Sequence, residues 1–65
     1  MRKNVYIRHE PAHRALLVVY ADEMKAGHRL YAQFDDRRKS MDDVINYVRE
    51  NQEIRLVCAI SGKPI

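Results

Sequence analysis

Apolar and polar residues alternate along residues 4–9 with a period of two. Val5 and Ile7 share one side of this segment, and Tyr6 and Arg8 share the other. Such alternation is typical of a strand with one buried and one exposed face. A proline follows shortly afterwards, and because proline has no main-chain N–H to donate, we expect the strand to end there.

Three further strands are predicted downstream. Residues 14–21 are mostly aliphatic and β-branched, which is typical of a central strand covered on both faces. A polar turn that ends in glycine is expected over residues 22–27, and strand-like alternation follows over residues 28–34 and 53–60. Residues 61–65 are expected to form a C-terminal tail.

The helix signal begins at Ser40. The Ser40 side chain is suited to accept a hydrogen bond from the first helical turn, and Asp43, three residues later, completes a capping box at the positive end of the helix dipole. We expect this helix to end near Asn51. Its apolar residues recur at helical spacing and form one stripe: Met41, Val44, Ile45 and Val48.

The element order strand, strand, strand, helix, strand predicts an α+β fold in a single small domain, residues 1–65. A lone helix buries its apolar stripe by lying across one face of the sheet. Residues 35–52 are long enough for a crossover, which favours spatial order 3-2-1-4 in a four-stranded, mostly antiparallel sheet. The strand residues expected beneath the helix are Val5, Ile7, Leu17 or its neighbours, Leu30, Phe34, Ile54 and Leu56.

Length and composition narrow the classes of function. A chain of 65 residues has a small core and little stability with which to support a deep cleft. We therefore expect no enzymatic activity, no cofactor, no metal and no small-molecule substrate. Cys58 is the only cysteine, so no intramolecular disulfide is possible, and a reduced thiol suggests a cytoplasmic setting. No apolar run approaches the roughly 20 residues that cross a bilayer, so no membrane partner is expected.

A single helix covers one face of the sheet, and the other face is expected to be open to a partner. Tyrosine and arginine side chains around an apolar patch are common at interfaces. The residues predicted on this face are Tyr6, Arg8, Tyr20, Arg29, Tyr31 and Arg55. They favour docking to a protein, either a host protein or a second copy in a homodimer. They also suit nucleic acid, through base stacking and phosphate contacts, or could simply cover aliphatic groups with their stems.

A basic run precedes the helix. Arg37, Arg38 and Lys39 form a candidate contact for phosphate or an acidic partner, although Asp35 and Asp36 are adjacent and can neutralise them. The net charge of +3, from 12 basic and 9 acidic residues, is mild and mixed along the chain. It permits a nucleic-acid partner without requiring one.

Two apparently chemical features have plainer interpretations. Residues 9–13 match the pattern H-E-x-x-H of zinc hydrolases, but Pro11 disfavours the helix that would place His9 and His13 on one face. We interpret this segment as a loop with solvated histidines. Cys58 falls on the predicted inner side of the last strand, and we expect a buried small hydrophobe and not a nucleophile.

Residues 4–8, the following hairpin, residues 36–38 and the helix loosely resemble the amino-terminal arm-binding domain of phage integrases, which places a three-stranded sheet on DNA. The additional last strand, Asp22 and Glu23 depart from that pattern. In size and element order the chain also resembles compact phage and mobile-element proteins that block host enzymes. The leading hypothesis is therefore a non-catalytic protein that occludes a host macromolecule. The alternatives are a nucleic-acid-binding module and a homodimeric structural or regulatory protein.

Overall fold

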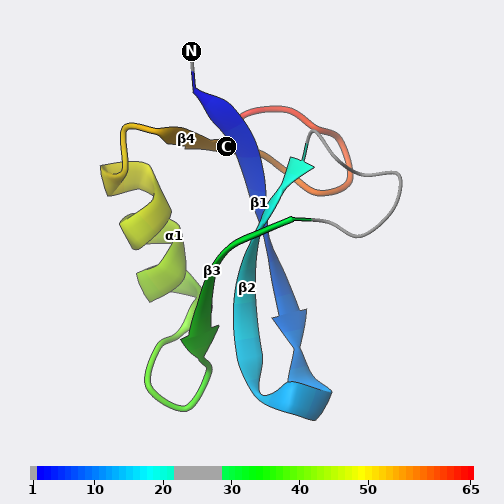
Figure 1. The fold of residues 1–65 in the computed structure, drawn as a ribbon, viewed down its shortest axis with the longest axis vertical. Coiled ribbons are helices and arrows are strands. Elements are labelled where there is room, and N and C mark those ends of the chain that lie inside the picture. The colour runs from blue at the N-terminus through cyan, green and yellow to red at the C-terminus, as the bar shows by residue number, and fades with distance from the viewer. Residues whose placement is uncertain (1, 22–28) are drawn as a thin grey trace.

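The computed structural model describes residues 2–21 and 29–65, and the turn expected over residues 22–27 lies outside them. The described chain folds as an α+β unit in which one helix packs on a four-stranded mixed sheet (Figure 1). The elements are β1 (Lys3–Glu10), the short 3-10 helix η1 (Pro11–His13), β2 (Ala15–Tyr20), β3 (Leu30–Asp35), α1 (Met41–Glu50) and β4 (Ile54–Leu56).

The strand order is β3-β2-β1-β4, as predicted. β2 pairs antiparallel with both β1 and β3, whereas β4 pairs parallel with β1 after the crossover through α1. The β2–β3 register shifts between Val18 and Val19. Such an irregularity changes the face alternation that a regular ladder would keep.

The predicted helix boundaries are confirmed. The main-chain N–H of Asp43 donates to Ser40 Oγ (3.3 Å), and the main-chain N–H of Ser40 donates to Asp43 Oδ2 (3.1 Å). The main-chain N–H of Ser40 and its hydroxyl, which donates to Asp43 Oδ2 (3.0 Å), lower the pKa of the Asp43 carboxyl, because both bonds stabilise its charged form. α1 ends at Glu50, and Asn51 occupies the C-cap position.

The main core lies between α1 and the sheet. Val5, Val18, Val44 and Val48 are fully buried there, one from each of two strands and two from the helix. Leu16, Ile54 and Leu56 complete this cluster, with Ile7, Tyr20, Tyr31, Ala32, Phe34 and Ile45 packed around it. β2 thus turns Leu16 and Val18, the two neighbours of Leu17, to the helix.

The prediction that Leu30 and Met41 lie in this core is wrong. Leu30 is 46% exposed and Met41 is 37% exposed. Both stand at the first position of their elements, where the sheet and the helix stripe have fewer neighbours to cover them.

The opposite face of the sheet has its own apolar cluster, which corrects the prediction of an open face. Tyr6, Val19 and Val57 are only 6%, 2% and 3% exposed, and Leu17 and Ala21 pack against them. The part of this face that spans β2, β1 and the end of β4 is therefore a second small core.

The last predicted strand is much shorter than expected, because β4 contains only Ile54–Leu56. Beyond it the chain turns back on itself. The N–H of Cys58 donates to the carbonyl of Lys63 (2.9 Å), and the N–H of Ile65 donates to the carbonyl of Leu56 (3.1 Å). The predicted tail is thus a folded C-terminal segment, which loops out beside β1 on the side away from α1 and ends near β4 in Figure 1.

Candidate functional site

The six residues predicted on one open face divide between the two faces. Tyr20 and Tyr31 pack against the helix-side core, with ring centroids 5.7 Å apart in an edge-on contact. Arg29 lies over the Tyr20 ring at 4.7 Å from its centroid. These three residues are brought together, but not on the face opposite α1, so their predicted placement is wrong.

Tyr31 is held by the helix as well as by the sheet. Burial raises the pKa of its hydroxyl, and the Glu53 carboxylate raises it further, while a hydrogen bond with Asn51 acts in the opposite direction. Both tyrosine rings pack against the helix-side core, and Arg29 also lies over the Tyr20 ring, so the two rings do not form the open stacking surface that the sequence predicted.

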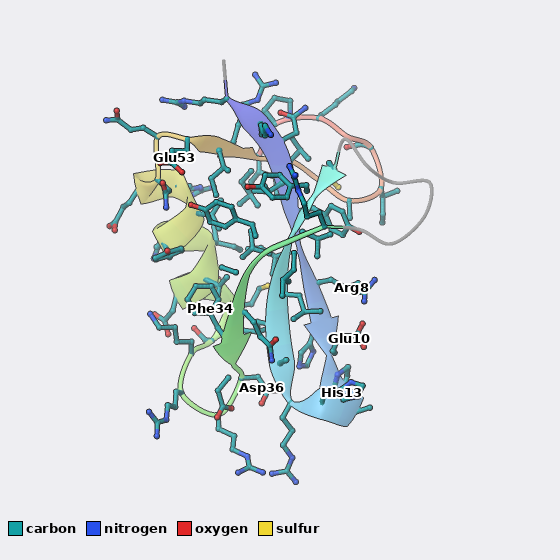
Figure 2. The ribbon with its side chains drawn as sticks, in the orientation of Figure 1. Arg8, Glu10, His13, Phe34, Asp36 and Glu53 are labelled. Carbon is teal, nitrogen blue, oxygen red and sulfur yellow. The ribbon has the colours of Figure 1, made fainter. Side chains whose placement is uncertain are left out.

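Tyr6, Arg8 and Arg55 are the predicted residues on the face away from α1. Tyr6 is buried, so it is not available to a partner. Arg8 is exposed and forms an ion pair with Glu10, and both side chains point away from α1 in Figure 2. The Arg55 Nε–H donates to Asn4 Oδ1 (3.2 Å) and remains exposed.

The outer edge of β1 offers a different kind of site. β4 pairs with β1 only along Lys3–Val5, and the last bond of this ladder runs from the Val57 N–H to the Val5 carbonyl (2.9 Å). Alternate residues of a strand direct their main-chain groups to the same edge. Ile7 and His9 therefore direct theirs to the side where β4 has ended, and among the described residues nothing pairs with them. We call these groups the free β1 edge.

An apolar groove of about 170 Å³ adjoins the free β1 edge. It opens where β4 leaves the sheet, and its walls come from β1, α1, the end of β4 and the C-terminal segment. The lining residues include Ile7, Met41, Ile45, Leu56, Cys58 and Ile65. An edge with unpaired N–H and C=O groups beside an apolar groove is the arrangement that binds an added strand.

The environment of Cys58 differs from the prediction. The side chain is half-buried at the groove, not fully buried. Hydrogen bonds from the main chain of Ser61 and Ile60 lower the pKa of its thiol, because they stabilise the thiolate. The turn that follows β4 creates this environment.

The H-E-x-x-H match is not a helical pair of ligands in the structure. His9 lies at the end of β1, where its Nε2 is 3.0 Å from Asp36 Oδ2, and His13 lies on η1. Among residues 2–21 and 29–65, no three His, Cys, Asp or Glu side chains gather closely enough to hold a metal ion.

The three basic residues before α1 lie in a turn that gives each side chain different surroundings. Arg37 lines a hollow beside η1, whereas Lys39 Nζ lies 5.4 Å from the centroid of the Phe34 ring, and Arg38 is exposed. The structure thus places Arg37 of this run at a concave site.

Sequence reasoning missed the apolar groove because its walls come from four separate segments. The available signal was the C-terminal Gly62 and Pro64, which are typical turn residues and indicated that the chain could fold back before its end.

No protein-family description matches the chain, and neither a curated protein nor a solved structure is significantly similar to it. In the described part of the chain, no helix is both long and apolar enough to cross a membrane.

Proposed function

We propose that this chain is a non-catalytic binding protein that docks onto a partner protein by adding an extended segment of that partner to the free β1 edge. The observation that carries the proposal is the combination of unpaired main-chain groups at Ile7 and His9 with an adjoining apolar groove. Main-chain hydrogen bonds then supply affinity, and alternate side chains in the groove supply specificity.

A second copy of the chain fits this edge poorly. Val5 is already bonded to Val57, so a paired strand has to use the groups of Ile7 and His9. The antiparallel register that pairs Ile7 with His9 of the other copy places the two Arg8 side chains directly opposite each other. Like charges at that position are destabilising.

The edge also indicates the chemistry of the partner segment. Its side chains on the α1 side would enter the apolar groove, and those on the other side would lie near Arg8 and Arg55, which are both exposed. With a net charge of +3 on this chain, an acidic and apolar segment is favoured. Occlusion of a host macromolecule is the simplest consequence of such binding. A free thiol at Cys58 favours a cytoplasmic location for the protein.

The test begins with random unstructured peptides displayed on phage and selected on the intact chain. We expect enriched peptides to alternate apolar and acidic residues. His9→Pro removes the edge N–H without breaking a bond within the sheet, and it should weaken the selected peptide about tenfold or more. Bound peptide should also slow alkylation of Cys58, which lines the groove.

Two control variants show whether a change in peptide affinity comes from the lost N–H of the free β1 edge. His9→Ala removes the imidazole but keeps the N–H, so it should retain binding. Gln33→Pro places proline on the opposite edge of the sheet, where the outward N–H of β3 has no role in the proposal. Failure to enrich any peptide, or equal affinity for wild type and His9→Pro, would overturn strand addition. A dimer in ultracentrifugation that His9→Pro dissociates would replace the partner segment with a second copy.

A further inference from the structure

An open hollow of about 410 Å³ lies at the end of the sheet where the β1–β2 connection meets the turn between β3 and α1. Figure 2 shows His13 and Asp36 at this end, remote from Glu53 beside β4. The hollow shares no lining residue with the apolar groove. It is lined by His13, Arg14, Gln33, Phe34, Asp35 and Arg37.

Main-chain hydrogen bonds hold these two turns together. The N–H of Arg14 donates to the carbonyl of Pro11 (3.1 Å), and the carbonyl of Arg14 accepts from the N–H of Asp36 (3.0 Å). The N–H of Arg37 donates to Asp35 Oδ1 (2.9 Å). The backbones that carry the basic side chains of both turns are thus fixed around one hollow.

Arg14 is in the left-handed region, with φ of 50°. A residue with a Cβ is uncommon there, and glycine or asparagine adopts this conformation more readily. Arginine adopts this conformation less readily than glycine, and at this position it contributes a basic residue to the lining of the hollow. Backbone strain of this kind is concentrated at functional sites.

The arginine side chains around the hollow have no ion-pair partner among the described residues, although the Asp35 carboxylate also lines the hollow. No described residue forms an ion pair or hydrogen bond with the side chains of Arg14 and Arg37, or with His13. The neighbouring carboxylates have other partners than the guanidinium groups. Asp36 Oδ2 lies 3.0 Å from His9 Nε2, and Asp35 Oδ1, at the wall of the hollow, accepts the main-chain N–H of Arg37.

We infer that this hollow binds a single phosphoryl group, with the guanidinium groups of Arg14 and Arg37 and the imidazole of His13 as donors to its oxygens. Two arginines provide the charge and the planar donor geometry that phosphate requires. One phosphoryl group is favoured over a nucleic-acid strand, because Glu10 and Asp36 flank the site and interrupt the continuous basic stripe that a strand would need.

The test titrates inorganic phosphate into the intact chain and follows main-chain amide resonances, with sodium chloride at equal ionic strength as the reference. We expect saturable shifts confined to the two turns around the hollow. Arg37→Ala should weaken phosphate binding about 10- to 100-fold. Arg49→Ala removes the same charge from the far end of α1 and should leave binding nearly unchanged.

Arg14→Gly distinguishes the loss of a phosphate contact from the loss of folding. Glycine suits the left-handed conformation, so the stability of the variant should be close to that of the wild type or higher, while phosphate binding falls as in Arg37→Ala. A wild-type chain that shows no saturable phosphate response would overturn the inference. Equal binding by Arg14→Gly, Arg37→Ala and Arg49→Ala would also overturn it.

A second arm identifies the source of the phosphoryl group. A nucleoside monophosphate and a single-stranded oligonucleotide are titrated at several salt concentrations. For one phosphoryl group, the dependence of log affinity on log salt should correspond to about one contact. A slope of several contacts for the oligonucleotide, with no response to inorganic phosphate, would replace the single-group site with a nucleic-acid interface.

Discussion

The surroundings of individual side chains in this protein depend on turns, which the alternation of apolar and polar residues does not predict. Arg14 is placed at the hollow by a left-handed residue after η1, and Cys58 is placed at the groove by a turn after β4. In a regular strand, Cys58 would alternate into the core. Because the strand ends two residues earlier, its thiol instead meets the N–H groups of the next turn.

The lowered pKa of the Cys58 thiol makes a prediction for its reactivity. The thiolate is the form that reacts with iodoacetamide, so the alkylation rate should rise with pH around a midpoint lower in the native chain than in the unfolded chain. Ser61→Ala should raise the native midpoint, because it removes a hydroxyl that stabilises the thiolate. Ser40→Ala removes a distant hydroxyl and should not. Equal midpoints for native and unfolded chain would contradict this assignment.

At the level of elements, the helix is the part most completely specified by local sequence. Its cap requires only Ser40 and Asp43, three residues apart, and its apolar stripe requires only helical spacing. β4 is the opposite case. Its residues alternate as a strand for longer than they pair, because β1 and the returning C-terminal segment determine where pairing stops.

The capping box predicts a measurable contribution of Ser40. Ser40→Ala should reduce the free energy of unfolding by about 1 kcal/mol, because it removes the acceptor for an otherwise unpaired helical N–H. Urea unfolding followed by circular dichroism would measure this change. An unchanged midpoint would show that the cap is not formed in solution.

The same cap has a pH signature. The folded-state pKa of Asp43 lies below its ordinary value of 3.8, so its stabilisation is present above that pH and is lost as pH falls through the folded pKa. The stability difference between wild type and Asp43→Asn should therefore be constant near neutral pH and shrink in acid. Asp42→Asn changes a neighbouring carboxylate outside the capping box and should show a weaker pH dependence.

At the scale of the whole molecule, the described residues form two apolar clusters, one on each side of the sheet. Val48 belongs to the helix-side cluster, and Val19 belongs to the cluster on the opposite face. A 65-residue chain has little stability to distribute between separate units. We therefore expect both clusters to unfold in one cooperative transition.

Single and double substitutions test whether both clusters contribute to the stability of one folded unit. Val48→Ala and Val19→Ala should each reduce the free energy of unfolding by about 2 kcal/mol. Because the two side chains belong to different clusters, the double variant should show the sum of the two losses within about 0.5 kcal/mol. Chemical denaturation of the four proteins is the measurement. Two separate transitions, or a Val19→Ala variant as stable as wild type, would contradict a buried second face.

Local sequence by itself determined the helix, its cap and the strand segments on either side of it, and the length of the crossover favoured the strand order. These depend on spacing, capping chemistry and chain length, which act between near neighbours or through the reach of the connection. Only the tertiary structure decided which side chains share a surface. The β2–β3 register shift, the early end of β4 and the returning C-terminus moved Tyr31 to the helix side and buried Tyr6. Such placements arise from pairing between distant segments, and one displaced residue in a strand reverses the face that every later side chain occupies.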